Sequence, residues 1–191
     1  MAFSQDILSL DDIMIRHLGE GEKELHVLTY FQRKDSTMAE RIKTNDRRPN
    51  HGKLLVAAID FGTTCTGYAY SLTQDYERDP LNIGTKQSWK GSAEIGLQAP
   101  TSILFDPGKN FHSFGFEAEN KYKDLAFKKQ HRDWYFFRHF KMILHHVKNL
   151  TRDTDLEATN QKLMKARVVF TKAIKAVIEH LQTTVISTKS Y

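Results

Sequence analysis

A short motif, Asp-Phe-Gly-Thr-Thr-Cys at positions 60–65, carries the clearest chemistry in this sequence. A phosphate-binding turn needs backbone N–H groups that converge on an oxygen, and Gly62 allows a close approach because it has no Cβ. Thr63 and Thr64 add hydroxyl donors, while Asp60 can hold Mg²⁺ through water, because this ion keeps most of its hydration shell. The motif predicts a phosphate site, with a plain hairpin turn capped by Asp as the alternative.

Two strand-like stretches flank the motif. Residues 54–59 form a continuous apolar run of strand length, which is typical of a strand buried on both faces of a sheet. Residues 66–72 predict a second strand, and two strands joined by a tight turn that contains glycine form a hairpin. We therefore expect the motif to lie at the turn of a β-hairpin.

A second hairpin is expected further along the chain. Residues 101–105 and 111–114 have strand composition and flank residues 106–110. Within this connection, Pro107 followed by Gly108 suits a type II turn, because the second central position of that turn needs a positive φ.

Helical patterns follow Gly115. The first has apolar residues at helical spacing, namely Phe137, Phe140, Leu144 and Val147. The second is a long amphipathic helix that opens at Thr154 and Asp155, with an apolar stripe of Leu163, Ala166, Phe170, Ile174, Val177 and Leu181. The β-branched residues of 183–187 indicate the start of a strand.

The N-terminal quarter differs in character from the rest. Residues 5–18 fit a short helix, with Ser4 as its cap and Gly19 as its stop. The sequence then becomes polar as far as Gly52 and predicts a linker. We therefore expect residues 1–52 to form an N-terminal extension or linker, disordered in part, and residues 53–191 to form one domain.

Composition limits the class of protein. The chain has 191 residues, one cysteine, a net charge of +5, and no apolar run of membrane-spanning length or secretory signal. These features exclude an intramolecular disulfide framework and a thiolate-rich zinc site, and they predict a cytoplasmic protein. Residues 121–148 alone carry +6, which we expect to be the solvated face of a helix rather than a specific nucleic-acid site. Its cations are Lys121, Lys123, Lys128, Lys129, Arg132, Arg138, Lys141 and Lys148.

Several segments together carry a resemblance to a known family. They are AIDFGTTCTGYAYS, APTSILF, FHSFGFEA, YFFRHFKMILH and LTRDTDLEATN, in this order within residues 54–182. The sequence resembles the actin-like ATPase superfamily, whose first phosphate loop is a D-x-G-T-T hairpin, and within it the heat shock 70 kDa protein 12 family. The resemblance implies an α/β fold of the ribonuclease-H-like kind, of which this chain is a first-lobe fragment with β-hairpins followed by helices.

The resemblance also implies a ligand and its contacts. ATP would be held with Mg²⁺ between two lobes, with Asp60 facing the metal through water. Gly62, Thr63, Thr64 and Cys65 would wrap the β- and γ-phosphates. A chaperone of the stress response, with protein clients and co-chaperones as partners, is the activity that the family implies.

Two departures from the family pattern reduce the expected ATPase activity. The family places a catalytic lysine four residues after the glycine of the FHSFG segment, where this chain has Glu119, with Lys121 two residues further on. A second glycine-rich phosphate loop, an adenosine-binding loop and a second lobe do not occur within the 191 residues. Phosphoryl transfer needs its charge neutralised from several sides of the nucleotide, and one hairpin can supply only one of these sides. We therefore expect an incomplete module with weak or no ATPase activity and assign no catalytic residue; a truncated gene model, a short isoform and a remnant all fit.

Two other functions remain open at this stage. A non-enzymatic interaction or adaptor fragment would expose part of the stripe between Leu163 and Leu181, which predicts self-association through that face. A sugar-kinase-like phosphotransferase would share the D-x-G-T-T motif, although the FHSFG and YFFRHFKM segments speak against it.

Overall fold

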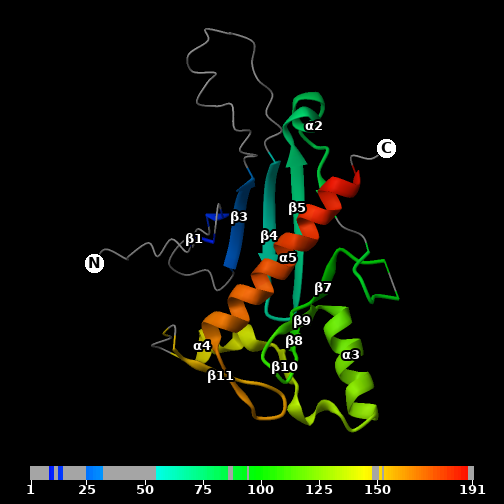
Figure 1. Ribbon diagram of the computed structural model, residues 1–191. Helices are drawn as coiled ribbons and strands as arrows, with labels where there is room; N and C mark the ends of the chain where they lie inside the picture. The colour runs from blue at the N-terminus through cyan, green and yellow to red at the C-terminus, as the bar shows by residue number, and fades with distance from the viewer. Residues whose placement is uncertain are drawn as a thin grey trace, which may run out of the picture. The chain divides into compact units, whose positions relative to one another are not determined.

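The computed structural model describes residues 9–10, 13–14, 25–31, 55–85, 88–93, 95–147, 151 and 153–188 (Figure 1). These residues form a mixed α/β structure in which the strand pairs of known register are antiparallel. The chain divides into two compact units, Met1–Ile59 with Ala69–Thr85 and Asp60–Tyr68 with Lys86–Tyr191. None of the described helices is both long and apolar enough to cross a bilayer.

The largest sheet has the strand order β3-β4-β5-β6, and β7 also pairs with β5. Its elements are β3 Leu25–Phe31, β4 Leu55–Phe61, β5 Cys65–Leu72, β6 Gly84–Thr85 and β7 Gln98–Pro100, with helix α2 Thr73–Arg78 after β5. The predicted hairpin around the motif is confirmed, because β4 and β5 are neighbours joined by three residues.

Burial along β4 differs from the expectation. Ala57 and Ile59 are 1% and 2% exposed, whereas Val56 is 37% exposed and Ala58 is also exposed. The prediction of a strand buried on both faces is therefore wrong. Side chains of a strand alternate between its faces, and a strand in a hairpin can pack one face while the other meets solvent.

The N-terminal expectations also need correction. Ser9–Leu10 (β1) pairs antiparallel with Ile13–Met14 (β2), so the helix predicted over residues 5–18 is wrong at these positions. The sequence around these strands contains two consecutive Asp residues, a residue type with low helix propensity, which explains the difference. Strand β3 lies within the stretch predicted as a linker. The other residues of 1–52 lie outside the described ranges, and the boundary at residue 52 stays a prediction.

The second unit contains a three-stranded sheet of order β10-β8-β9 with helix α3 packed against it (Figure 1). Its elements are β8 Ser102–Phe105, β9 Phe111–Phe114, α3 Phe116–Phe127, η1 His131–Asp133 and β10 Tyr135–Arg138. Leu104, Ala118, Leu125 and Phe136 form a buried cluster between the helix and the sheet. This arrangement confirms the second hairpin, β8–β9, and the helix after Gly115.

The turn of the second hairpin is not of type II. Lys109 N donates to Asp106 O at 2.9 Å, so Gly108 is the second central residue. The positive φ belongs to Lys109, at 65°, and not to Gly108. A turn followed by one left-handed residue is a common hairpin connection, because it restores the twist of the strands.

The boundaries of the later helices also differ from the prediction. Phe137 lies in β10, opposite Ile103 of β8, and is followed by the short helices η2 Phe140–Met142 and α4 Ile143–His146. Sheet pairing therefore overrides the helical spacing at Phe137, whereas Phe140 and Leu144 lie in the short helices.

The long C-terminal helix, α5 Ala166–Thr188, begins twelve residues later than predicted. Thr154 and Asp155 precede it, and the hairpin of β11 Asp155–Glu157 and β12 Leu163–Lys165 lies in between. Residues 183–187 continue the helix, so the predicted strand start is wrong. Leu163 is 54% exposed in β12, whereas the stripe members on α5 are buried or half-buried. The expected uncovered stripe is therefore wrong along the helix.

Candidate phosphate-binding site

The predicted motif forms the turn of the β4–β5 hairpin. Strand β4 ends at Phe61 and β5 begins at Cys65, so Gly62, Thr63 and Thr64 form the turn itself. Asp60 and Thr64 are exposed, and the other turn residues are half-buried. The structure thus brings the predicted residues together at one place that solvent reaches.

Gly62 is required by the close approach of the backbone. A Cβ at this position would lie 2.3 Å from the carbonyl oxygen of Cys65, far closer than real contacts. Its φ is not positive, so the reason is space rather than backbone conformation. Only glycine therefore fits at position 62 of this turn without a shift of the backbone.

Thr101, between β7 and β8, holds the turn through two carbonyl groups. Its N–H donates to Thr64 O at 2.8 Å, and its hydroxyl donates to Gly62 O at 2.8 Å. Thr66 Oγ1 lies 2.7 Å from Thr101 Oγ1, and both residues are buried. Since the single Thr101 hydroxyl proton points to Gly62, the Thr66 hydroxyl is the donor in this pair.

Lys141, in η2, holds a third carbonyl. Its side chain is 1% exposed, and its Nζ donates to Phe61 O. This burial differs from the prediction, in which Lys141 belongs to the solvated cations of residues 121–148. Its position between Phe140 and Met142 is the one local signal of burial.

The ring of Phe61 joins this end of β4 to two other elements. Its centroid lies 6.1 Å from that of Phe140 in η2 and 6.4 Å from that of Phe170 in α5. The rings of Phe140 and Phe170 are 5.2 Å apart at an interplanar angle of 79°. The Phe140–Phe170 pair is edge-to-face and the two pairs with Phe61 are tilted, and these contacts pack the three rings together.

The held carbonyls determine where the turn amides point. In a trans peptide the N–H lies opposite the C=O of the same unit, and no described peptide bond is cis. Because Lys141 holds Phe61 O, the Gly62 N–H points away from Lys141. Because the Thr101 hydroxyl holds Gly62 O, the Thr63 N–H points away from Thr101. Backbone amides that point away from the groups holding a tight loop are donors of the kind that bind anions.

Asp60 supplies one carboxylate beside the turn. Its Oδ2 accepts a hydrogen bond from Gln98 Nε2 at 3.3 Å. Among the described residues, no three His, Cys, Asp or Glu side chains gather as metal ligands. A single exposed carboxylate does not form a protein cage, but it fits Mg²⁺, which prefers water and phosphate oxygens with one or two carboxylates.

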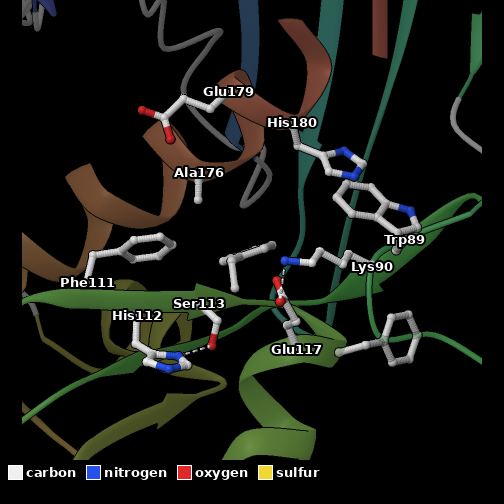
Figure 2. Close-up of a pocket in the computed structure, with 11 residues that line it drawn as sticks. Trp89, Lys90, Phe111, His112, Ser113, Glu117, Ala176, Glu179 and His180 are labelled. Atoms are coloured by element: carbon white, nitrogen blue, oxygen red, sulfur yellow. Dashed lines mark hydrogen bonds and ion pairs between the residues drawn. The ribbon is translucent and has the colours of Figure 1, made fainter. Parts of the chain in front are cut away.

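A cavity in the second unit is lined by none of the turn residues. It measures about 150 Å³ and is lined among others by Trp89, Phe111, Ala176 and His180 (Figure 2). Lys90 Nζ and Glu117 Oε1 form an ion pair of 2.7 Å across its side, and the Trp89 and His180 rings stack at 4.3 Å. None of the predicted site residues lines it. The turn, rather than the cavity, is therefore the candidate site.

Comparison with known proteins shows which proteins this chain is similar to. No family model matches the chain, and no solved structure matches it. Heat shock 70 kDa protein 12A of Mus musculus is 42% identical over 124 residues, 64% of this chain. Heat shock 70 kDa protein 12B of Homo sapiens is 39% identical over 148 residues, 75% of this chain. This chain is a relative of heat shock 70 kDa proteins 12A and 12B.

The relationship confirms the resemblance inferred from the sequence. It also has a limit, because the matched region covers 18% of the mouse 12A protein and 21% of the human 12B protein. The chain thus spans about a fifth of the length of these heat shock relatives.

Glu119 and Lys121, the residues near the expected heat-shock lysine position, make other contacts. Glu119 Oε1 accepts a hydrogen bond from Ser102 Oγ at 3.0 Å. Lys121 Nζ lies over the Trp134 ring, 5.9 Å from its centroid. Ser102 thus fixes the carboxylate at this position, and the lysine nearby is turned to an aromatic ring.

Proposed function

We propose that this chain is an ATP-binding module of the divergent 70 kDa heat-shock type, with residues 60–65 as its first phosphate loop. The observation that carries the proposal is the turn itself. Lys141 holds the Phe61 carbonyl and Thr101 holds the Gly62 carbonyl, so that the Gly62 N–H points away from Lys141 and the Thr63 N–H points away from Thr101. The relationship to the heat shock 12A and 12B proteins supports the same assignment.

The fold proposed for residues 53–191 is the first lobe of an actin-like, ribonuclease-H-like domain. The antiparallel hairpins β4–β5 and β8–β9, with the helices that follow them, support this proposal. A chaperone role with protein clients or co-chaperones also stays a proposal, supported by the heat shock names of the relatives. Cytoplasmic location stays a proposal that rests on the sequence alone.

In the proposed complex, the turn residues bind phosphate oxygens. The Gly62 and Thr63 amides donate hydrogen bonds to these oxygens, and the Thr63 and Thr64 hydroxyls are further donors. Cys65 is the last residue of the loop. Asp60 would face Mg²⁺ through its water shell. Bound Mg²⁺ would supply positive charge that offsets the phosphates and the Asp60 carboxylate.

Hydrolysis is proposed to be weak or absent. Glu119 places a carboxylate, bonded to Ser102, where the family pattern has a lysine. Phosphoryl transfer depends on positive charge around the transferred group, and the turn supplies donors from one side.

Titration of a fluorescent ATP analogue in the presence of Mg²⁺ tests the binding. We expect saturation below millimolar concentration and a loss of about tenfold or more in Thr63→Ala and Asp60→Ala, since a hydrogen bond to a charged group is worth about 1.5–3 kcal/mol. Lys172→Ala, at an exposed position of α5, is the matched control and should bind as the wild type does. Binding that is unmeasurable, or equal in all four chains, would contradict the proposal.

A further inference from the structure

A single aromatic ring projects into solvent at the end of α3. Phe127, the last residue of this helix, is 90% exposed, more than any other large apolar side chain in the described part of the chain. Leu125, two residues earlier, is buried in the cluster that packs the helix against its sheet. The helix ends at the outer edge of the second unit, where the chain turns back towards β10 (Figure 1). Lone exposed apolar residues are common, so the ring by itself does not identify a site.

The turn that follows the ring has an unfavourable residue at its central position. Lys129 N donates to Ala126 O at 3.0 Å, and Gln130 N donates to Leu125 O at 2.8 Å. This pair of hydrogen bonds is typical of a helix end at which a left-handed residue, most often glycine, follows the last turn. Here that residue is Lys129, with a φ of 57°, although a side chain is disfavoured in this conformation. Local stability therefore does not explain the lysine at this position.

Cations surround the ring in the sequence. Residues 121–132 contain five basic side chains and one acidic side chain, Asp124. The basic side chains that are exposed are Lys123, Lys128, Lys129 and Arg132. The ion pairs recorded between described residues use other lysines, namely Lys90, Lys162, Lys165 and Lys175. A single cation near the C-terminus of a helix is enough to stabilise its dipole, so this number of exposed cations indicates an anionic partner.

We propose that Lys123, Phe127, Lys128, Lys129 and Arg132, together called the α3 tip, bind the surface of a membrane that contains anionic lipids. The cations lie at the level of the lipid phosphates, and the ring enters the boundary with the acyl chains. Lys123 and Phe127 share a face of the helix, because they are four residues apart. A protein partner is less favoured, since one protruding ring supplies little of the apolar area that a stable protein interface buries. The inference is independent of the proposed nucleotide binding.

Co-sedimentation of the full chain with vesicles tests the inference. We expect binding to vesicles of equimolar phosphatidylserine and phosphatidylcholine, little binding to phosphatidylcholine alone, and release by salt, which screens exposed charges. Phe127→Ser should lower the partition coefficient about tenfold, since it removes the ring that the lipid buries. The double variant Lys123→Gln with Lys128→Gln should lower it about twentyfold at low salt, because each cation near an anionic surface adds to the attraction.

Two matched controls carry the same changes at other places. Leu163→Ser removes an exposed apolar side chain of β12, and Lys172→Gln with Lys175→Gln removes two exposed cations of α5. Both should bind nearly as the wild type does. Equal losses in the controls and the α3 tip variants, no loss in Phe127→Ser, or a wild type that binds neither kind of vesicle overturns the inference. Binding to soluble polyglutamate or to RNA that is as tight as binding to the anionic vesicles also overturns it, in favour of another acidic partner.

A second measurement follows the position of the ring. Phe127→Trp should retain binding, and its added fluorescence should be quenched by lipids that are brominated on the acyl chains. Leu163→Trp is the control, whose added fluorescence these lipids should leave unchanged. Trp89 and Trp134 emit in every variant, so each variant is compared with the wild type. Phe127→Trp without added quenching overturns the inference, because the ring then stays outside the membrane.

Discussion

The two hairpins of this chain are closed in opposite ways. In β8–β9 the turn closes on itself: Asp106 Oδ1 accepts from Asn110 N at 2.8 Å, and Asp106 N donates to Asn110 O at 3.0 Å. In β4–β5 the turn carbonyls bond to Thr101 and Lys141, which lie far along the sequence. The first arrangement uses its polar groups internally, whereas in the second the Gly62 N–H points away from Lys141 and the Thr63 N–H away from Thr101. A turn built by distant residues is therefore the better candidate for binding an anion.

The largest expected difference between the hairpins is in their tolerance of a methyl group. Gly62→Ala should lower the free energy of unfolding by about 3 kcal/mol, because the new Cβ meets a backbone carbonyl that cannot move aside. Gly108→Ala is the matched change in the other turn, where the nearest atom, at 3.0 Å, belongs to the flexible Asn110 side chain. It should cost about 1 kcal/mol or less. Urea denaturation measures both, and equal losses would contradict the comparison.

The next effect concerns the group that holds the first turn from outside. Thr101→Val removes the hydroxyl that donates to Gly62 O and accepts from Thr66, leaving the half-buried Gly62 carbonyl and the buried Thr66 hydroxyl without this partner. We expect a loss of about 2 kcal/mol in the free energy of unfolding and weaker ATP binding. Thr101→Ser, which retains the hydroxyl, is the control and should lose clearly less. Equal behaviour of the two variants would show that the hydroxyl does not hold the turn.

The smallest effect is a pH dependence in the second turn. Hydrogen bonds from the Asn110 backbone and then its side chain lower the pKa of Asp106 below 3.8. Because the native pKa is lowered, the stabilisation is present above the unfolded pKa and is lost as the pH falls through the native value. An NMR titration of the Asp106 carboxyl carbon should give a midpoint below 3.8. In Asn110→Ala the midpoint should rise, and a midpoint that does not move would contradict the assignment.

The sequence allowed prediction of features that depend on local contacts, but not of those that depend on distant contacts. Both hairpins were predictable, because glycine-containing turns between strand-like runs are local signals. The position of the candidate site at the first turn followed from the order of its residues. The groups that hold that turn did not, since Thr101 and Lys141 reach it only through tertiary packing.

The wrong predictions have the same cause. Phe137 has helical spacing with its neighbours, yet it pairs with Ile103 in a sheet whose existence depends on a distant strand. Ala166 starts α5 because the β11–β12 hairpin precedes it, and spacing alone did not reveal that hairpin. Lys141 was placed on a wet surface because its charge suggested solvent, whereas the packing around Phe140 decided its burial.

The interlocked rings of Phe61, Phe140 and Phe170 have a mechanical consequence. Since each ring abuts the other two, the end of β4 cannot slide along its own axis unless α5 and η2 shift with it. A rigid base of this kind lowers the entropy that the loop would lose on gripping a ligand. Through the same ring contacts, a change of conformation in the loop would be transmitted to α5.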